Sequence, residues 1–387
     1  MLLVSMRDAR AAEVRAVEAL LRSHAEVAAR VPDGAGVTLL ARSSNGELAP
    51  VAERIGRMPG VARVARIDSR YVLSAREAAP GRTAVRVDEG LEVGGREFVV
   101  IAGPCSVESG PQMRATARAV AGAGARALRG GAFKPRTSPF SFQGLGEEGL
   151  AILADVRRET GLAVVSELLG PRSLEAVDAT VDVIQVGMRN ALNYSLLKEL
   201  GRLPSRRPVL LKCGIGTSLD EFLCAADYVL AGGNPNVILC LRGTVGFSQE
   251  SRCALNLVDI PALRARTHLP IVVDPSHAAG RWEFVPAVAA SALVAGADGL
   301  LVEVHHDPAA ALSDADQSLK PSRFHRMMHR LSLLAPVLGR TIADLTTPVC
   351  DPEGHPMGDL CLEAPTAGLQ PSCVAAATTA REACHGE

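Results

Sequence analysis

The sequence predicts an α/β protein that combines a (β/α)8 barrel with a small N-terminal ferredoxin-like domain. Length is the first observation, because 387 residues exceed the roughly 250 residues that one barrel needs. The second is that eight short apolar runs alternate with helical stretches from Phe98 onward. The third is that the residues before them show the order βαββαβ, which is typical of a split βαβ, ferredoxin-like module.

The N-terminal domain, residues 1–75, is predicted from apolar runs, two helical periodicities and the turn sequence PDGAG. It shows no obvious catalytic group, so a binding or regulatory role is predicted. The predicted strands are residues 2–5, 26–31, 37–42 and 61–67, and the predicted helices are residues 11–24 and 49–58.

The barrel is predicted over residues 95–340, after a linker at residues 76–94. Its strand candidates are continuously apolar, as expected of parallel strands that are buried on both faces. After Leu338 the periodicity ends, and residues 346–387, rich in Ala, Thr, Pro and Cys, are predicted to be a disordered extension. The strand candidates are residues 98–103, 125–130, 163–168, 181–187, 208–213, 236–243, 269–277 and 297–305.

Composition excludes several classes of partner. With 41 basic and 42 acidic residues the formal net charge is -1, so no global field attracts nucleic acid or an acidic membrane. The N-terminus lacks the features of a signal peptide and no stretch is apolar enough to span a membrane, which predicts a cytoplasmic protein. The nine cysteines lack tight spacing and are predicted to be reduced, with Cys224, Cys240 and Cys253 serving in packing.

Polar side chains follow nearly every predicted barrel strand. Because the carboxyl ends of the strands meet at one mouth of a barrel, these side chains are expected to converge on one site. They are Cys105, Arg129, Glu167, Arg189, Lys212, Arg242, His277 and Glu303.

The segment from Arg129 to Gly144, RGGAFKPRTSPFSFQG, is the most specific signal in the chain. Its three cations, close glycines and hydroxyls are suited to holding phosphate and carboxylate groups. Together with IAGPCSVES (101–109), QVGMRN (185–190), DPSH (274–277) and EVHHDPAAALSDADQSL (303–319), it resembles the short 3-deoxy-D-arabino-heptulosonate 7-phosphate (DAHP) synthases that carry a ferredoxin-like domain. The resemblance extends from the start of the chain to about residue 340.

This resemblance implies two phosphorylated substrates, phosphoenolpyruvate and erythrose 4-phosphate, and a divalent metal ion such as Mn, Fe, Zn or Co. The mixed thiolate, imidazole and carboxylate ligands suit these metals better than Mg. Lys134, Cys105 and His277 are expected to be catalytic. The implied phosphoenolpyruvate residues are Arg129, Lys134, Arg189, Lys212 and Arg242; the erythrose 4-phosphate residues are Arg136, Thr137 and Ser138; the metal ligands are Cys105, His277, Glu303 and Asp314.

The resemblance further implies a place at the entry of the shikimate pathway and a homo-oligomer, expected to be a tetramer. In the implied reaction the metal polarises the sugar aldehyde, C3 of phosphoenolpyruvate attacks it, water captures C2, and inorganic phosphate leaves by C–O cleavage. Relatives with this N-terminal domain can bind an aromatic amino acid between subunits.

The chain departs from the family pattern at several positions, and these changes remove charges near the mouth of the barrel. Cys213 replaces an arginine and Asn256 an acidic residue, while Leu241, Thr244 and Val245 stand where the family has the glutamate, the isoleucine and the second arginine of Glu-Arg-Gly-Ile-Arg. These changes leave open a different aldose phosphate, such as arabinose 5-phosphate in the related 3-deoxy-octulosonate 8-phosphate synthases. They also leave open a non-catalytic barrel that binds a partner enzyme. The sequence Lys134-Pro135-Arg136-Thr137 favours the four-carbon sugar.

Overall fold

The computed structural model describes residues 1–345, apart from 34–35, 44–47 and 247–249. The predicted disordered extension at residues 346–387 lies outside the described residues. The elements that the structure does describe follow the predicted order closely.

The N-terminal residues form a four-stranded antiparallel sheet in the order β2-β3-β1-β4, with two helices. This confirms the βαββαβ order. On α1 the residues Val14, Val17 and Leu21 are buried with the apolar side chains of β1, as the helical spacing predicts. The elements are β1 (Leu2–Met6), α1 (Ala11–Arg22), β2 (Glu26–Asp33), β3 (Gly36–Arg42), α2 (Ala49–Gly56) and β4 (Val61–Arg66).

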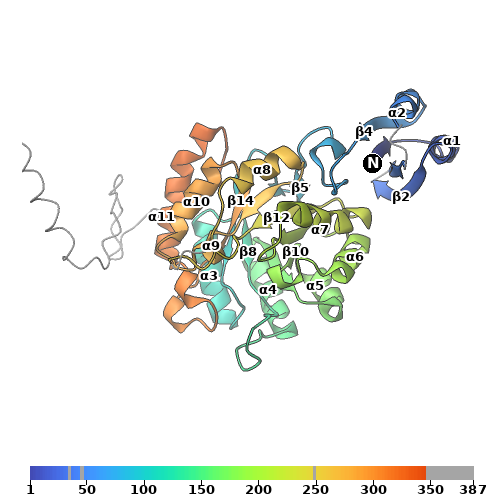
Figure 1. Cartoon of the computed structure of the whole chain (residues 1–387). Coiled ribbons are helices and arrows are strands. Elements are labelled where there is room, and N and C mark those ends of the chain that lie inside the picture. Colours follow the sequence, from blue (N-terminus) through green and yellow to red (C-terminus); the bar gives the residue numbers. More distant parts are fainter. Residues whose placement is uncertain (34–35, 44–47, 247–249, 346–387) are drawn as a thin grey trace, which may run out of the picture. The chain divides into compact units, whose positions relative to one another are not determined.

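The main body is a closed barrel of eight parallel strands, which confirms each of the eight predicted strand positions. Figure 1 shows helices surrounding these strands. The strands are β7 (Val99–Gly103), β8 (Ala127–Arg129), β9 (Ala163–Leu168), β10 (Val183–Val186), β11 (Val209–Lys212), β12 (Val237–Leu241), β13 (Ile271–Val273) and β14 (Gly299–Glu303). The helices are α3 (Gly110–Gly122), α4 (Glu147–Thr160), α5 (Leu174–Thr180), α6 (Tyr194–Arg202), α7 (Leu219–Ala231), α8 (Asp259–Arg266), α9 (Pro275–Ala279), α10 (Val285–Val294) and α11 (Pro321–Leu334).

The barrel strands are buried on both faces, which explains their continuous apolar character. One set of side chains fills the barrel interior, and the alternate set packs under the helices. Helix boundaries follow ordinary capping rules. Ser218 caps α7 and forms a capping box with Glu221, while α4 ends at Gly161 in the left-handed conformation with φ 71°.

The segment predicted as a linker carries a short antiparallel hairpin of β5 (Val85–Arg86) and β6 (Glu92–Val93). Val85 and Val93 share one buried cluster with interior barrel side chains such as Val99. The segment therefore contributes to the core of the barrel besides connecting two sheets.

His268 contacts both the end of the N-terminal domain, at Leu73, and this segment, at Thr83. Its Nε2 donates to the Leu73 carbonyl at 2.8 Å, which leaves Nδ1 to accept from the Thr83 hydroxyl at 2.7 Å. Burial lowers the pKa of His268 most strongly, the bond to the Leu73 carbonyl opposes this effect, and nearby arginines lower the pKa again. The neutral imidazole is thus the form that the fold favours.

We expect acid to destabilise the protein through His268. Because its pKa is lower in the folded than in the unfolded chain, the unfolded chain binds more protons below about pH 6.5, the usual histidine value. Stability should fall as the pH drops through that window, by at most about 1.4 kcal/mol per pH unit from this group. Urea unfolding of wild type and His268→Asn between pH 7.5 and 5 tests this, and equal pH dependence in both proteins contradicts it.

Candidate active site and metal centre

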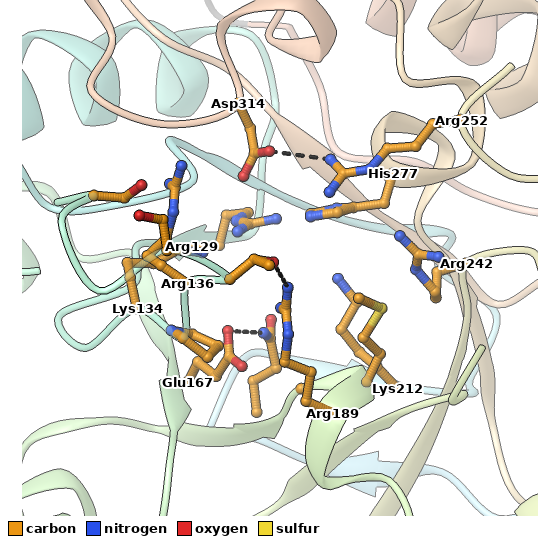
Figure 2. Close-up of a pocket in the computed structure, with 17 residues that line it drawn as sticks. Arg129, Lys134, Arg136, Glu167, Arg189, Lys212, Arg242, Arg252, His277 and Asp314 are labelled. Carbon is orange, nitrogen blue, oxygen red and sulfur yellow. Dashed lines mark hydrogen bonds and ion pairs between the residues drawn. The ribbon is translucent and has the colours of Figure 1, made fainter. Parts of the chain in front are cut away.

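One pocket gathers the predicted substrate residues at the carboxyl ends of the barrel strands. Arg129 ends β8, Lys212 ends β11, and Arg242 directly follows β12, so the fold alone brings these three cations to the same mouth. Figure 2 shows the labelled side chains around a common space. The charged and hydroxyl residues that line the pocket are Arg129, Lys134, Arg136, Thr137, Ser138, Ser141, Glu167, Arg189, Lys212, Arg242, Arg252, His277 and Asp314.

Four of these cations are almost completely buried, with exposed fractions of 3% for Arg129, 7% for Lys134, 4% for Lys212 and 1% for Arg242. Burying a charge is costly unless a partner offsets it. Nη2 of Arg242 makes no hydrogen bond within the described part of the chain. The lining carries many more cations than acids. An anionic ligand would therefore complete the charge balance of the pocket.

The loop between β8 and α4 forms one wall of the pocket. The Lys134 amide donates to the Gln143 carbonyl at 2.8 Å, which closes the loop. Gly144 has φ 92°, and a Cβ there would lie 2.2 Å from the Ala132 carbonyl oxygen, so this close approach requires glycine. Across the pocket, Arg189 donates to the Thr137 hydroxyl at 3.3 Å. The loop thus presents hydroxyl and guanidinium groups opposite the buried cations.

A group of four side chains suited to a metal ion lies beside this pocket, and His277 and Asp314 of this group also line the pocket. One ligand atom from each of Cys105, His277, Glu303 and Asp314 lies within 4.8 Å of the others. Glu303 Oε1 is buried and accepts no hydrogen bond within the described residues, although His277 Nε2 and Arg129 Nη1 lie 3.5 and 3.2 Å away. A soft thiolate, an imidazole and two carboxylates fit a transition metal ion.

Asp274 orients the imidazole of this group. Its Oδ1 caps α9 by accepting from the His277 amide at 2.9 Å, and its Oδ2 lies 2.8 Å from His277 Nδ1. The same Oδ2 forms an ion pair with Lys212. Burial alone would raise the pKa of Asp274, but His277 and Lys212 hold it well below its usual range. The anionic carboxylate places the proton on Nδ1 and leaves Nε2 for a metal ion.

The thiol of Cys105 is protonated when no metal is bound. Burial and the charge of Glu303 raise its pKa to about 12, against the opposing effects of Lys134 and Arg129. Its Sγ donates to Asp314 Oδ2 at 2.8 Å and accepts from Lys134 Nζ at 3.1 Å. Lys134 thus contacts a predicted metal ligand and lines the anion pocket at the same time.

The residues that depart from the family pattern, Cys213, Leu241, Thr244, Val245 and Asn256, do not line the pocket. Cys213 and Leu241 are buried in the apolar layer between the strands and the helices. Asn256 donates to Asp259 Oδ1 at 2.8 Å. None of these departures therefore changes a residue that lines the pocket.

Several residues of the site were not assigned a role from the sequence. Arg252 lines the pocket, and the buried Glu167 accepts from Gln185 Nε2 at 3.3 Å. Cys253, expected only to pack, is buried and accepts from Arg242 Nη1 at 2.8 Å. Glu167 and Asp274 lie at strand ends, and this position in the sequence indicates a place at the mouth of the barrel. Nothing in the sequence distinguished Arg252 or Cys253 from other surface or core residues.

Fold and site together define a (β/α)8-barrel protein with a strongly cationic pocket beside a group suited to a transition metal. The chain belongs to the DAHP synthetase I family, whose pattern matches residues 82–335. It is 42% identical over 289 residues to phospho-2-dehydro-3-deoxyheptonate aldolase of Thermotoga maritima, a match that covers 75% of this chain and 85% of the relative.

Solved structures agree with this assignment. The crystal structure of the Thermotoga maritima phospho-2-dehydro-3-deoxyheptonate aldolase (DAHP synthase) matches with a TM-score of 0.69 and 36% identity, over 88% of this chain and 98% of that chain.

A relative that is more distant in sequence is 2-dehydro-3-deoxyphosphooctonate aldolase of Syntrophobacter fumaroxidans, which is 31% identical over 62% of this chain and 88% of its own length.

We expect Asp274→Asn to destabilise the metal-free protein by about 3 kcal/mol, because it leaves the Lys212 ammonium buried without its counter-charge. Asparagine has nearly the same shape and can still cap α9. Urea unfolding measures the loss, and the double variant Asp274→Asn, Lys212→Met should recover part of it. A loss below about 1 kcal/mol would contradict the role of this ion pair.

Proposed function

We propose that this chain condenses phosphoenolpyruvate with erythrose 4-phosphate and water to give DAHP and inorganic phosphate. The observation that carries the proposal is the pairing of the cation-rich pocket with the four metal-ligand side chains at one barrel mouth. Membership of the DAHP synthetase I family supports the reaction. Two phosphorylated substrates carry several negative charges. These would balance the excess of positive charge in the pocket.

Phosphoenolpyruvate is assigned to the inner part of the pocket. Arg129, Lys134 and Lys212 are nearly buried, and we assign them to its carboxylate region. Arg189 and Arg242 are assigned to its phosphate. A guanidinium offers two parallel donors to such a group, and Nη2 of Arg242 has a donor that the described chain does not use.

Erythrose 4-phosphate is assigned to the loop between β8 and α4. Arg136, Thr137 and Ser138 line the pocket there, and their side chains are more exposed than those of the inner cations. This position would leave the sugar phosphate near the solvent and direct its aldehyde toward the metal-ligand group. Holding both substrates in one orientation removes much of the entropic barrier to their reaction.

A divalent metal ion held by Cys105, His277, Glu303 and Asp314 would supply Lewis-acid polarisation of the aldehyde oxygen. The chain's own residues prepare the site for it. Lys134 donates to Cys105 Sγ and so favours the thiolate, while Asp274 fixes the tautomer of His277. The cations offset the mutual repulsion of the substrates and hold the developing phosphate.

A five-carbon acceptor is less well supported. The 2-dehydro-3-deoxyphosphooctonate aldolases match at lower identity and over less of the chain than the Thermotoga maritima relative does. A non-catalytic barrel is disfavoured because all four metal-ligand side chains are present and lie together.

A cytoplasmic location and a tetramer remain predictions. Within the described residues, no helix is both long enough and apolar enough to cross a membrane. The choice among Mn, Fe, Zn and Co is likewise part of the proposal, because the ligand set suits each of them.

The direct test is phosphate release by the purified protein with Mn²⁺, phosphoenolpyruvate and either erythrose 4-phosphate or arabinose 5-phosphate. We expect turnover with the four-carbon sugar and its loss on addition of EDTA, since chelation removes the metal. Preference for the five-carbon sugar would contradict the assigned acceptor. No release with either sugar would contradict the proposed reaction.

We expect Cys105→Ala to abolish metal-dependent turnover while the protein stays folded, because one of the four ligands is lost. Phosphate release and bound metal, measured on the same sample, check this. Cys224→Ala is the matched control, since Cys224 lies on α7 and does not line the pocket. Activity of Cys105→Ala after removal of metal would contradict the metal assignment.

A further inference from the structure

Gln317 is a buried residue with an exposed fraction of 2%, and its side-chain amide lies between two carboxylates of the metal-ligand group. Its Nε2 donates to Glu303 Oε2 at 2.6 Å. Its Oε1 accepts from Arg252 Nη1 at 2.9 Å, and the same Nη1 donates to Asp314 Oδ1 at 3.0 Å. One amide and one guanidinium therefore connect Glu303 and Asp314.

The orientation of this amide follows from its two neighbours. A carboxylate oxygen only accepts hydrogen bonds when ionised, and a guanidinium only donates them. A flipped amide would place Oε1 against Glu303 and Nε2 against Arg252, which gives two repulsive contacts in place of two hydrogen bonds. Gln317 consequently has one stable orientation.

In this arrangement one oxygen of each carboxylate accepts a hydrogen bond from Gln317 or Arg252. The other oxygen of each carboxylate faces the remaining metal-ligand side chains. In Glu303, Oε2 is held by Gln317, whereas Oε1 faces His277 Nε2 at 3.5 Å. In Asp314, Oδ1 is held by Arg252, whereas Oδ2 lies 2.8 Å from Cys105 Sγ. Each carboxylate thus presents a single oxygen to the same space.

The backbone fixes both supporting residues. The Leu319 amide donates to the Glu303 carbonyl at 2.9 Å, which holds the segment of Gln317 beside the end of β14. The amides of Arg252 and Cys253 donate to the carbonyls of Ala279 and Ala278 at 3.1 and 3.0 Å, next to His277 on α9. Asp314 itself has φ 50°, a left-handed conformation that its contacts must maintain.

We propose that Gln317 and Arg252 are positioning residues that make Glu303 and Asp314 each bind the metal through one oxygen. This inference rests on the proposed metal site and adds how its geometry and affinity are set. Residues that hydrogen-bond to metal ligands commonly change metal affinity by 10- to 100-fold when they are substituted. Because Arg252 also lines the pocket, the Gln317–Arg252 pair connects the metal ligands to the pocket that is proposed to bind the substrates.

The test uses Co²⁺ as the probe in metal-free full-length protein, with a chelator competing for the ion. Absorption from the thiolate–Co²⁺ bond reports binding through Cys105, and the visible bands of Co²⁺ report its coordination number. Gln317→Met keeps the size of the side chain and removes both hydrogen bonds. We expect a Kd about 10- to 100-fold higher and weaker visible bands, because Glu303 is then free to bind through both oxygens.

Two further variants separate this role from general packing. Gln185→Met is the matched control, because Gln185 is also buried and donates to a pocket carboxylate, Glu167, outside the metal-ligand group. It should leave the Kd for Co²⁺ within about twofold of wild type, since no metal ligand loses a partner. Arg252→Lys keeps the charge and a donor, but its flexible ammonium lacks the fixed planar geometry that directs one nitrogen to both Gln317 and Asp314, so it should weaken binding more mildly. The Arg252 side chain is 42% exposed, so its substitution should not prevent folding. Arg252→Lys therefore still tests the inference if Gln317→Met does not fold.

Arg252→Lys should raise the Kd less than Gln317→Met does. In the double variant the two effects should not add, because the two residues act as one unit. Wild type without a thiolate–Co²⁺ band would overturn the proposed metal site. Wild type with that band, together with equal Kd values and spectra in Gln317→Met and Arg252→Lys, would overturn this inference alone.

Discussion

The concentration of positive charge at the mouth of the barrel is the constraint on which the rest of the site depends. Arg129, Lys212 and Arg242 lie together because each stands at the carboxyl end of a parallel strand. All three are buried, and burying a charge costs free energy unless a partner offsets it. Arg129 lies 3.2 Å from Glu303, and Lys212 forms an ion pair with Asp274. Each buried cation thus needs an acceptor from the chain or from a ligand, and the acids at this mouth are too few to supply one for every cation.

Three of the four buried cations of the pocket have partners that belong to the metal-ligand group or orient one of its members. Arg129 contacts Glu303, Lys134 contacts Cys105, and Lys212 contacts the carboxylate that orients His277. The charges of the cation-rich pocket and of the metal-ligand group are therefore coupled, because the same cations contact both. A bound metal ion would compete with the cations for the same negative charges, which would leave them more available to anionic substrates. Binding of metal and of phosphorylated substrate should therefore favour each other.

The sequence predicted the barrel, its strands and the convergence of its strand ends, because continuous apolar runs and their polar ends are local signals. It also predicted Cys105 and His277 as neighbours, although this rested on the resemblance to a family. It did not predict Gln317 or Cys253, because their roles depend on side-chain hydrogen bonds with residues on other elements, Glu303 and Arg252 for Gln317 and Arg242 for Cys253. No periodicity or spacing marks such a contact.

The departures at Cys213 and Leu241 are best understood through burial. Both side chains lie in the apolar layer behind the mouth, where a charged pair would have to be buried away from water. Replacing a buried ion pair with apolar groups is often neutral or stabilising, since the cost of removing two charges from water disappears. The pocket lining includes neither residue, whereas all eight predicted substrate residues are part of it. Changes behind the mouth are therefore compatible with the proposed four-carbon acceptor, because the residues assigned to it line the pocket and these do not.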